Sequence, residues 1–177
     1  MEQLKAILKK LIAMPLSNED IIHAVNGECN FVLYSDIPNY KNVEELLGPY
    51  KACVILYNDM LDCGHFVTLL QHPNKPKELE FHDPIGVAID QELKWIKKVK
   101  QYPALTKLAY DGGYSIKYND QKLQKVSEQI ASCGRHSIVR LWLRDYDIDE
   151  YCKLIRSSKL SPDELVALVT SEYPKEE

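Results

Sequence analysis

Three short segments of the chain combine a reactive side chain with a local context that would aim it. His65 follows Gly64 at the start of the strand-like "CGHFVTLL", Asp83 ends the strand-like "LEFHDPIG", and Cys133 opens the apolar helix "CGRHSIVRLW". Neighbouring strands lie about 4.8 Å apart, so a histidine and a carboxylate at adjacent strand ends can hydrogen-bond. A thiol, an imidazole and a carboxylate in this arrangement favour nucleophilic catalysis by cysteine.

The predicted position of Cys133 favours its thiolate form. A helix N-terminus supplies unpaired N–H groups and a partial positive charge, which lower the pKa of a thiol, and a nearby imidazole takes its proton. Gly134 leaves room for a substrate carbonyl above the helix start, where backbone N–H groups would stabilise an oxyanion. A side-chain amide would add a donor, and the glutamines 121, 124 and 129 lie just upstream of Cys133.

Each of these residues also has an ordinary structural explanation. A free cysteine is most often a small buried hydrophobe. His65 stands beside Phe66 and Val67, which fits a hydrogen-bonded core histidine. Asp83-Pro84 is a common turn-forming pair. Each residue taken alone therefore leaves the catalytic and structural interpretations open.

A zinc site is the other chemical alternative. Zinc takes cysteine and histidine ligands, and the chain offers Cys63, His65, His82, Cys133 and His136. No CxxC pair occurs, however, and the spacing follows no structural-zinc pattern. We therefore expect no metal and no cofactor.

Composition sets the outer limits of function. The 177 residues suit one domain, 1–177, with the N-terminal helical segment 1–27 packed on the core. A net charge of −4 gives no general attraction to nucleic acid or to an anionic membrane. No apolar run reaches the roughly 18–20 residues of a membrane span, and the charged N-terminus is not a signal peptide. Five cysteines, an odd number, predict free thiols in a reducing, intracellular setting.

The hydrophobic pattern predicts helices, then a cluster of strands, then helices. Strands are expected in "FVLYSDIP", "KACVILYN", "GHFVTLLQ", "ELEF" and "YSIKYN". Helices are expected before Pro15, from Ser17 to Gly27, in "VEELLG", and over 90–102 and 134–145. Two more follow in "DEYCKLIRS" and "SPDELVALV", the last with a capping box. The predicted fold class is α+β, with a mostly antiparallel or mixed sheet flanked by helices and the nucleophile at the N-terminus of a buried helix.

The order of these parts resembles the adenain-like and Ulp-like cysteine proteases. Those proteases carry histidine, an acidic residue, glutamine and cysteine in this chain order. Here "GHFVTLL" is similar to their "GHW" strand, "LEFHDPIG" to their acidic segment and "CGRHSIVRLW" to their "CGxxxxxxL" helix. The resemblance covers residues 50–145. The strings "YNDQKLQ", "SCGRHSIVRL" and "SPDELV" are similar to the maturation proteases of virophages, Maverick/Polinton elements and some giant viruses.

The resemblance implies a role for each site residue. Cys133 is the expected nucleophile, His65 the general base and then acid, and Asp83 the residue that orients His65. Relatives place the oxyanion glutamine six or seven residues before the cysteine, whereas Gln124 lies nine before it and Gln129 four before it. We favour Gln124, because it follows a strand-like segment as in the viral pattern, and a loop insertion explains the count.

The resemblance also implies how the substrate is met. Gly64, Gly134 and Phe66, which replaces the tryptophan of most relatives, are expected at the substrate. The expected reaction is cleavage of capsid or other virion precursor proteins after small, Gly-Gly-like residues, because glycine passes a narrow cleft where a side chain would clash. A monomer acting in the virion and host cytoplasm, with no nucleic-acid or membrane partner, is expected. A deubiquitinase or deSUMOylase and a catalytically silent binding module with the same fold remain alternatives.

Overall fold

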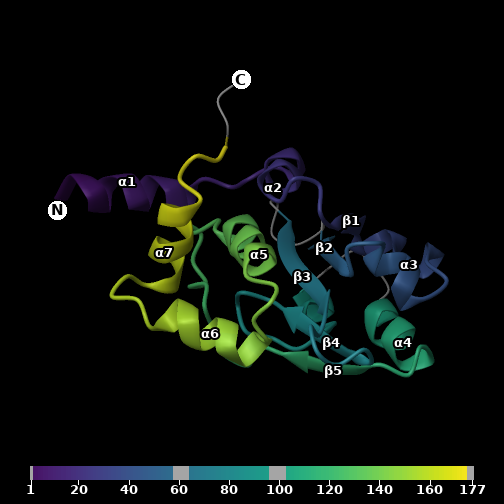
Figure 1. The fold of residues 1–177 in the computed structure, drawn as a ribbon. Coiled ribbons are helices and arrows are strands. Elements are labelled where there is room, and N and C mark those ends of the chain that lie inside the picture. The colour runs from purple at the N-terminus through teal and green to yellow at the C-terminus, as the bar shows by residue number, and fades with distance from the viewer. Residues whose placement is uncertain (1, 58–63, 96–102, 175–177) are drawn as a thin grey trace.

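A computed structural model describes residues 2–57, 64–95 and 103–174. These residues form a single α+β domain (Figure 1). Within these residues five strands make one sheet in the order β1-β2-β3-β4-β5. They are β1 (Asn30–Leu33), β2 (Ala52–Tyr57), β3 (His65–Gln71), β4 (Glu78–His82) and β5 (Ser115–Tyr118). The β2–β3 and β3–β4 pairs are antiparallel, and the outer β1–β2 and β4–β5 pairs are parallel. The predicted α+β class with a mixed central sheet is confirmed.

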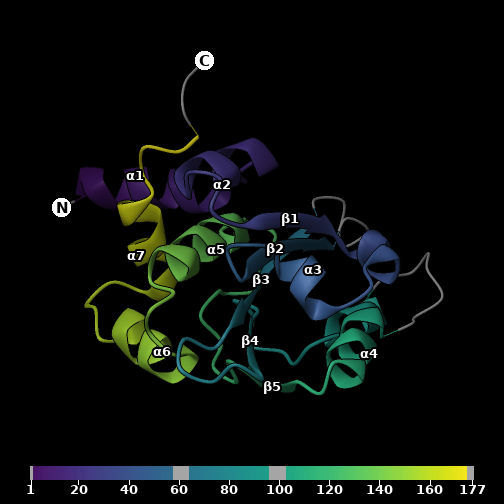
Figure 2. The ribbon, with the colours of Figure 1, turned by 45° about the vertical axis from the view of Figure 1, so that its right-hand side comes forward.

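Helices cover both faces of the sheet, so the central strands are apolar on both sides (Figures 1 and 2). One face packs against the 3₁₀-helix η1 (Tyr34–Asn39), α3 (Val43–Leu47) and α4 (Ala104–Asp111). The other packs against α2 (Asn18–Ala24) and α5 (Cys133–Trp142). Successive residues of β2 divide between the two cores: Cys53 and Ile55 face the first, Ala52 and Val54 the second. The core on the second face packs α5 directly against the sheet.

Capping residues set where several helices begin. Ser17 caps α2 in a capping box with Asp20, and Ser161 caps α7 (Pro162–Val169) in a capping box with Glu164. Asp147 and Glu150 form the same motif at the start of α6 (Ile148–Arg156). The capping box predicted in "SPDELVALV" is therefore confirmed.

Three elements differ from the sequence-based prediction. The strand expected in "FVLYSDIP" ends at Leu33, and a 3₁₀-helix with Pro38 inside it follows. The helix expected over 90–102 is the 3₁₀-helix η2 (Gln91–Trp95) as far as Trp95, and residues 96–102 lie outside the described residues. Helix α4 was not predicted; it begins directly after Pro103, whose fixed φ suits a helix start.

The N-terminal helix α1 (Glu2–Ala13) extends from the body of the domain and contacts α7 (Figure 1). Its Leu8 is buried, while Leu4 and Ile7 are 47% and 49% exposed. The following segment packs more closely, since Leu16 and Ile21 belong to the core between the sheet and α5. Among the described residues, no helix combines the length and the apolar character that crossing a membrane requires.

Candidate active site

The antiparallel register of β3 and β4 brings His65 and Asp83 to one end of the sheet. Thr68 pairs with His82, so the first residue of β3 and the residue just after β4 lie together. His65 Nε2 is 2.8 Å from Asp83 Oδ1, and the two residues are 7% and 0% exposed. The hydrogen bond expected between these strand ends is present, and its burial strengthens the attraction between imidazole and carboxylate.

Backbone contacts fix the orientation of Asp83. Its Oδ1 also accepts the Ile85 N–H at 2.9 Å, within the turn that follows the strand. Asn119, just after β5, holds the Asp83 backbone from both sides: its Oδ1 accepts the Asp83 N–H at 3.0 Å, and its Nδ2 donates to the Asp83 carbonyl at 2.6 Å. The carboxylate is therefore rigidly presented to His65.

Cys133 is the first residue of α5, as predicted, and its thiol lies close enough to His65 for the imidazole to lower the pKa of the thiol. Because His65 Nε2 is bonded to Asp83, Nδ1 is the ring nitrogen left for the thiol. No side chain caps the helix at Ser132, so the first N–H groups of α5 are not occupied by a capping oxygen. The order Asp83, His65, Cys133 thus runs from a buried carboxylate to a thiol at a helix start.

The pKa of Cys133 distinguishes this thiol from the other described cysteines. Burial acts to raise its pKa, but the hydrogen bond and charge of His65 and the N–H groups of Phe66 and Gly134 outweigh burial, so the pKa lies below its ordinary value. Burial instead raises the pKa of Cys29 and Cys53, and it raises the pKa of Cys152 to about 11. Those three thiols are buried, whereas Cys133 is partly exposed.

The pKa shifts of His65 and Asp83 match an ion pair. Burial acts to lower the pKa of His65, but the hydrogen bond and charge of Asp83 and the contact with Cys133 hold that pKa well above its usual range. Burial acts to raise the pKa of Asp83, and hydrogen bonds from Glu92 and His65 outweigh it, so the pKa is lowered. Both shifts favour an imidazolium facing the Asp83 carboxylate at neutral pH, and the lowered pKa of Cys133 favours its thiolate form.

Glu92, on η2, is a part of the site that the sequence analysis missed. It is 0% exposed, and its carboxyl group interacts with that of Asp83. Among the described residues, both Glu92 carboxyl oxygens and Asp83 Oδ2 lack a hydrogen-bond partner. Burial and the neighbouring Asp83 carboxylate raise the pKa of Glu92 to about 10, which favours the protonated form of Glu92 at neutral pH. No local sequence pattern marked it, because its partner lies on another element.

The turn that carries Asp83 also holds Gln124. The Pro84 carbonyl accepts the N–H groups of Leu123 and Gln124 at 2.8 and 2.7 Å. Gly86 has φ +80°, and a Cβ there would lie 2.9 Å from the backbone of residues 121 and 122, so glycine permits this close approach. Gln124 is 7% exposed, with its Oε1 buried and unpaired.

The other two candidate glutamines, Gln121 and Gln129, are exposed. Burial and the backbone contact with Pro84 therefore distinguish Gln124 from the other two glutamines. The loop between Gln124 and Cys133 is longer than the spacing of relatives predicts, and Lys125 to Gln129 within it are exposed.

Gly134 and Phe66 are packed in the core between α2, α5 and the sheet, and the substrate contacts expected of these two residues and of Gly64 stay a prediction. The space beside Gly134 Cα is filled: a Cβ there would lie 3.2 to 3.5 Å from Ile21, Leu16 and Phe66. Phe66 is 7% exposed and packs in that same core. The backbone N–H groups of Phe66 and Gly134 act on the Cys133 thiol and help to lower its pKa. Gly134 thus permits close helix packing rather than leaving open space. Gly64 has φ +71°, which favours glycine.

His82 and His136, considered above as zinc ligands, are buried away from the thiol. His136 Nε2 is 3.0 Å from Asp163 Oδ1. Within the described part of the chain, neither ring nitrogen of His82 has a hydrogen-bond partner, and burial with the charges of Arg140 and His136 holds its pKa well below the usual range. Among the described residues, no group of three or more His, Cys, Asp or Glu side chains is arranged to hold a metal; Cys63 lies outside them.

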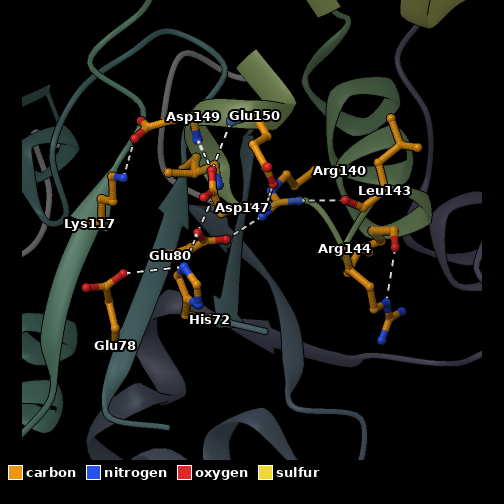
Figure 3. A network of polar contacts seen from close by, with 12 residues as sticks. His72, Glu78, Glu80, Lys117, Arg140, Leu143, Arg144, Asp147, Asp149 and Glu150 are labelled. Carbon is orange, nitrogen blue, oxygen red and sulfur yellow. Dashed lines mark hydrogen bonds and ion pairs between the residues drawn. The ribbon is translucent and has the colours of Figure 1, made fainter. Parts of the chain in front are cut away.

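A second buried polar network holds the other end of α5 (Figure 3). Glu80, on β4, is fully buried and accepts Arg140 Nη2 at 2.5 Å and the Ile148 N–H at 2.8 Å. Arg140, on α5, also donates to the Leu143 carbonyl at 3.0 Å. His72 approaches Glu80 at 3.8 Å. This network joins α5, the sheet and the start of α6.

Comparison with known proteins gives a relative along nearly the whole chain. The uncharacterized protein V9 of Sputnik virophage is 32% identical to this chain in an alignment 173 residues long, which covers 92% of this chain and 98% of V9. No protein-family model matches the chain. The similarity supports a virophage origin.

Proposed function

This chain belongs to the same family as the Sputnik virophage protein V9, and we propose that it is a cysteine endopeptidase. The observation that carries the proposal is the contact series from Asp83 through His65 to Cys133, which ends in a thiol of lowered pKa at a helix start. Buried structural cysteines have their pKa raised instead, as the other three described cysteines do.

In the proposed mechanism the Cys133 thiolate attacks the carbonyl carbon of the scissile peptide bond. The thiol proton moves to His65 Nδ1, and Asp83 on Nε2 stabilises the imidazolium. The tetrahedral intermediate collapses as the C–N bond breaks, and His65 gives the proton to the leaving amine. His65 then takes a proton from water, which attacks the acyl-enzyme thioester, and the thiol is restored as the acid product leaves.

The oxyanion of each intermediate is assigned to two groups of donors. The first is the backbone N–H at the start of α5, where no side chain caps the helix. The second is the side-chain amide of Gln124, whose backbone is fixed by the Pro84 carbonyl. Preorganised donors of this kind stabilise the charge that develops in the transition state.

The proposed substrate is a virion precursor, such as a capsid precursor, cleaved after small Gly-Gly-like residues. The family membership supports a virophage protein as substrate, and the resemblance to viral maturation proteases supports the cleavage preference. Glycine on the acyl side suits a nucleophile on a residue that is only partly exposed, because glycine has no side chain to obstruct the approach of the scissile carbonyl.

The test is cleavage of the virophage capsid precursor by the purified chain. Cys133→Ala is expected to abolish cleavage, because no nucleophile remains. Cys29→Ala is the matched control, since Cys29 is a buried thiol with a raised pKa, and it is expected to retain cleavage. Cleavage by Cys133→Ala at the wild-type rate would refute the proposal.

Two further probes separate the alternatives. Rapid labelling of Cys133 by a ubiquitin or SUMO vinyl sulfone, without cleavage of the capsid precursor, would indicate an isopeptidase. Alkylation of Cys133 by iodoacetamide with an ordinary thiol pKa would indicate a silent binding module.

A further inference from the structure

We propose that Asp163, near the start of α7, is a positioning residue that holds Gln124 and the N-terminus of α5 together as one oxyanion site. This inference rests on the proposed function. It concerns a residue that touches neither the thiol nor His65, and whose contacts lead instead to the two segments assigned to the oxyanion.

The Asp163 carboxylate bonds the residues directly beside Gln124 and Cys133. Its Oδ2 accepts the Lys125 N–H at 2.9 Å, and Lys125 follows Gln124. Its Oδ1 accepts the Ser132 hydroxyl at 2.6 Å, and Ser132 precedes Cys133. The two ends of the connecting loop are thus tied to the two oxygens of one carboxylate.

A third contact on the carboxylate comes from α5 itself. Asp163 Oδ1 lies 3.0 Å from Nε2 of His136, which is one turn along the helix that Cys133 begins. Asp163 therefore holds α5 at Ser132, the residue just before the helix, and again at His136. Since α7 also packs on α5, the carboxylate is carried by an element already fixed to the nucleophile helix.

Burial and charge keep this carboxylate ionised and rigid. Asp163 is 5% exposed and lies in the first helical turn of α7, where the helix dipole favours a negative charge. Burial acts to raise its pKa, but the hydrogen bonds of His136 and Ser132 and the Lys125 N–H outweigh burial, so the pKa is lowered. Each Asp163 oxygen has at least one donor, so the group is well satisfied.

This arrangement explains how Gln124 can contribute to the oxyanion site although it lies nine residues before Cys133 in the sequence. The Pro84 carbonyl holds Gln124 on one side, and Asp163 holds Lys125 on the other. Lys125 to Gln129 are exposed, so this part of the loop lies on the surface while Asp163 holds Lys125 and Ser132 at the loop's two ends. The separation along the sequence therefore does not set the separation of Gln124 from the helix start.

The test compares two reactions of the same thiol. Peptide hydrolysis passes through an oxyanion, whereas alkylation by iodoacetamide needs only the thiolate. For Asp163→Asn we expect kcat/KM for a Gly-Gly peptide to fall about 10- to 100-fold, mainly in kcat, because a small misplacement of oxyanion donors removes much of their effect. The rate and pH profile of Cys133 alkylation should stay within about twofold of wild type.

The matched control is Asp149→Asn. Asp149 holds the same position in α6 that Asp163 holds in α7, second in the helix after a capping residue, but it is exposed and pairs with Lys117. We expect wild-type hydrolysis from this control. Ser132→Ala removes one of the three contacts and is expected to lose hydrolysis by a smaller factor, so the inference stays testable if Asp163→Asn fails to fold.

Each outcome decides a different point. Wild-type kcat in Asp163→Asn and Ser132→Ala would overturn the positioning role and leave the proposed function standing. A parallel fall of hydrolysis and alkylation would also overturn it, because Asp163 would then support the thiolate or the fold. Alkylation of a wild-type chain that hydrolyses no peptide would overturn the proposed function and this inference together.

Discussion

Helix α5 is bound to the sheet by two buried charged networks that differ in whether a proton can move. Near its C-terminal end, the Arg140 guanidinium meets the Glu80 carboxylate, and both Glu80 oxygens accept N–H donors (Figure 3). Arginine keeps its charge at every relevant pH. At the N-terminal end, the Asp83 carboxylate meets His65, and an imidazole gains and loses a proton near neutrality.

The two networks also differ in what they leave open. The Glu80 network ends in backbone groups of the helix junction between α5 and α6. The Asp83 network ends at Cys133, a partly exposed residue, and Glu92 lies beside Asp83. We therefore expect the first network mainly to set stability and the second mainly to set reactivity, and each can be perturbed separately.

Removing the imidazole should give the largest loss of activity. His65→Ala takes away the proposed base and the partner that lowers the pKa of Cys133, so we expect peptide hydrolysis to fall by about 10³- to 10⁴-fold. The midpoint of the alkylation rate against pH should move upward, since a lone thiol keeps an ordinary or raised pKa. Equal alkylation profiles for the variant and wild type would break the assignment of His65 to the thiolate.

The next largest effect is expected at the other network, on stability rather than on chemistry. Arg140→Met leaves the Glu80 carboxylate buried without its cation, and we expect a loss of about 3–5 kcal/mol in the free energy of unfolding. The double variant with Glu80→Leu should recover much of that loss, because no uncompensated charge remains. Urea unfolding measures both. A double variant as unstable as the single one would show that the ion pair itself stabilises α5.

Local patterns predicted those parts of the site that local structure determines. The ends of "GHFVTLL" and "LEFH" and the start of "CGRHSIVRLW" are boundaries of elements, so His65, Asp83 and Cys133 could be located from apolar periodicity and turn residues. Their chain order then allowed the family resemblance. The α+β class followed from the same elements.

The supporting residues could not be predicted because their partners are distant in sequence. Asn119 lies 36 residues from Asp83, and Asp163 lies 31 and 38 residues from Ser132 and Lys125. Nothing in the composition around Glu92 marks a buried carboxylic acid. Residue type also did not reveal that Gly134 and Phe66 are packed in the core. That packing depends on α2, α5 and the sheet together, which no local pattern describes.

The choice between glutamines gives a sharper test of the reactive end. Gln124→Ala is expected to lower kcat about 10²-fold, because one oxyanion donor is lost. Gln129→Ala is the control; its side chain is exposed, and hydrolysis should be unchanged. Steady-state kinetics on one Gly-Gly peptide compares them. The reverse pattern would move the oxyanion role to the loop and contradict the contacts that Pro84 makes.

The last prediction concerns stability rather than activity, namely how stability depends on pH. The pKa of Glu92 is raised to about 10 in the folded chain, so its protonated form is favoured by folding. The resulting stabilisation is fully present below the pKa of an unfolded glutamate, about 4.3. It is lost as pH rises toward the folded value, by at most about 1.4 kcal/mol per pH unit. The side-chain amide introduced by Glu92→Gln does not ionise, so the substitution removes this loss.

We therefore expect the melting temperature of Glu92→Gln to exceed that of wild type by a margin that grows from pH 5 to pH 9. The other titratable groups around Glu92, namely His65, Asp83 and Tyr57, are present in both proteins and cancel in the difference. Glu128→Gln, an exposed change in the loop, is the control and should give no such trend. A margin that stays constant over this range would mean that Glu92 is ionised in the folded chain. Glu92 would then carry a constant negative charge beside Asp83. In that respect the Asp83 network would resemble the Arg140–Glu80 network, whose charges do not change over this pH range.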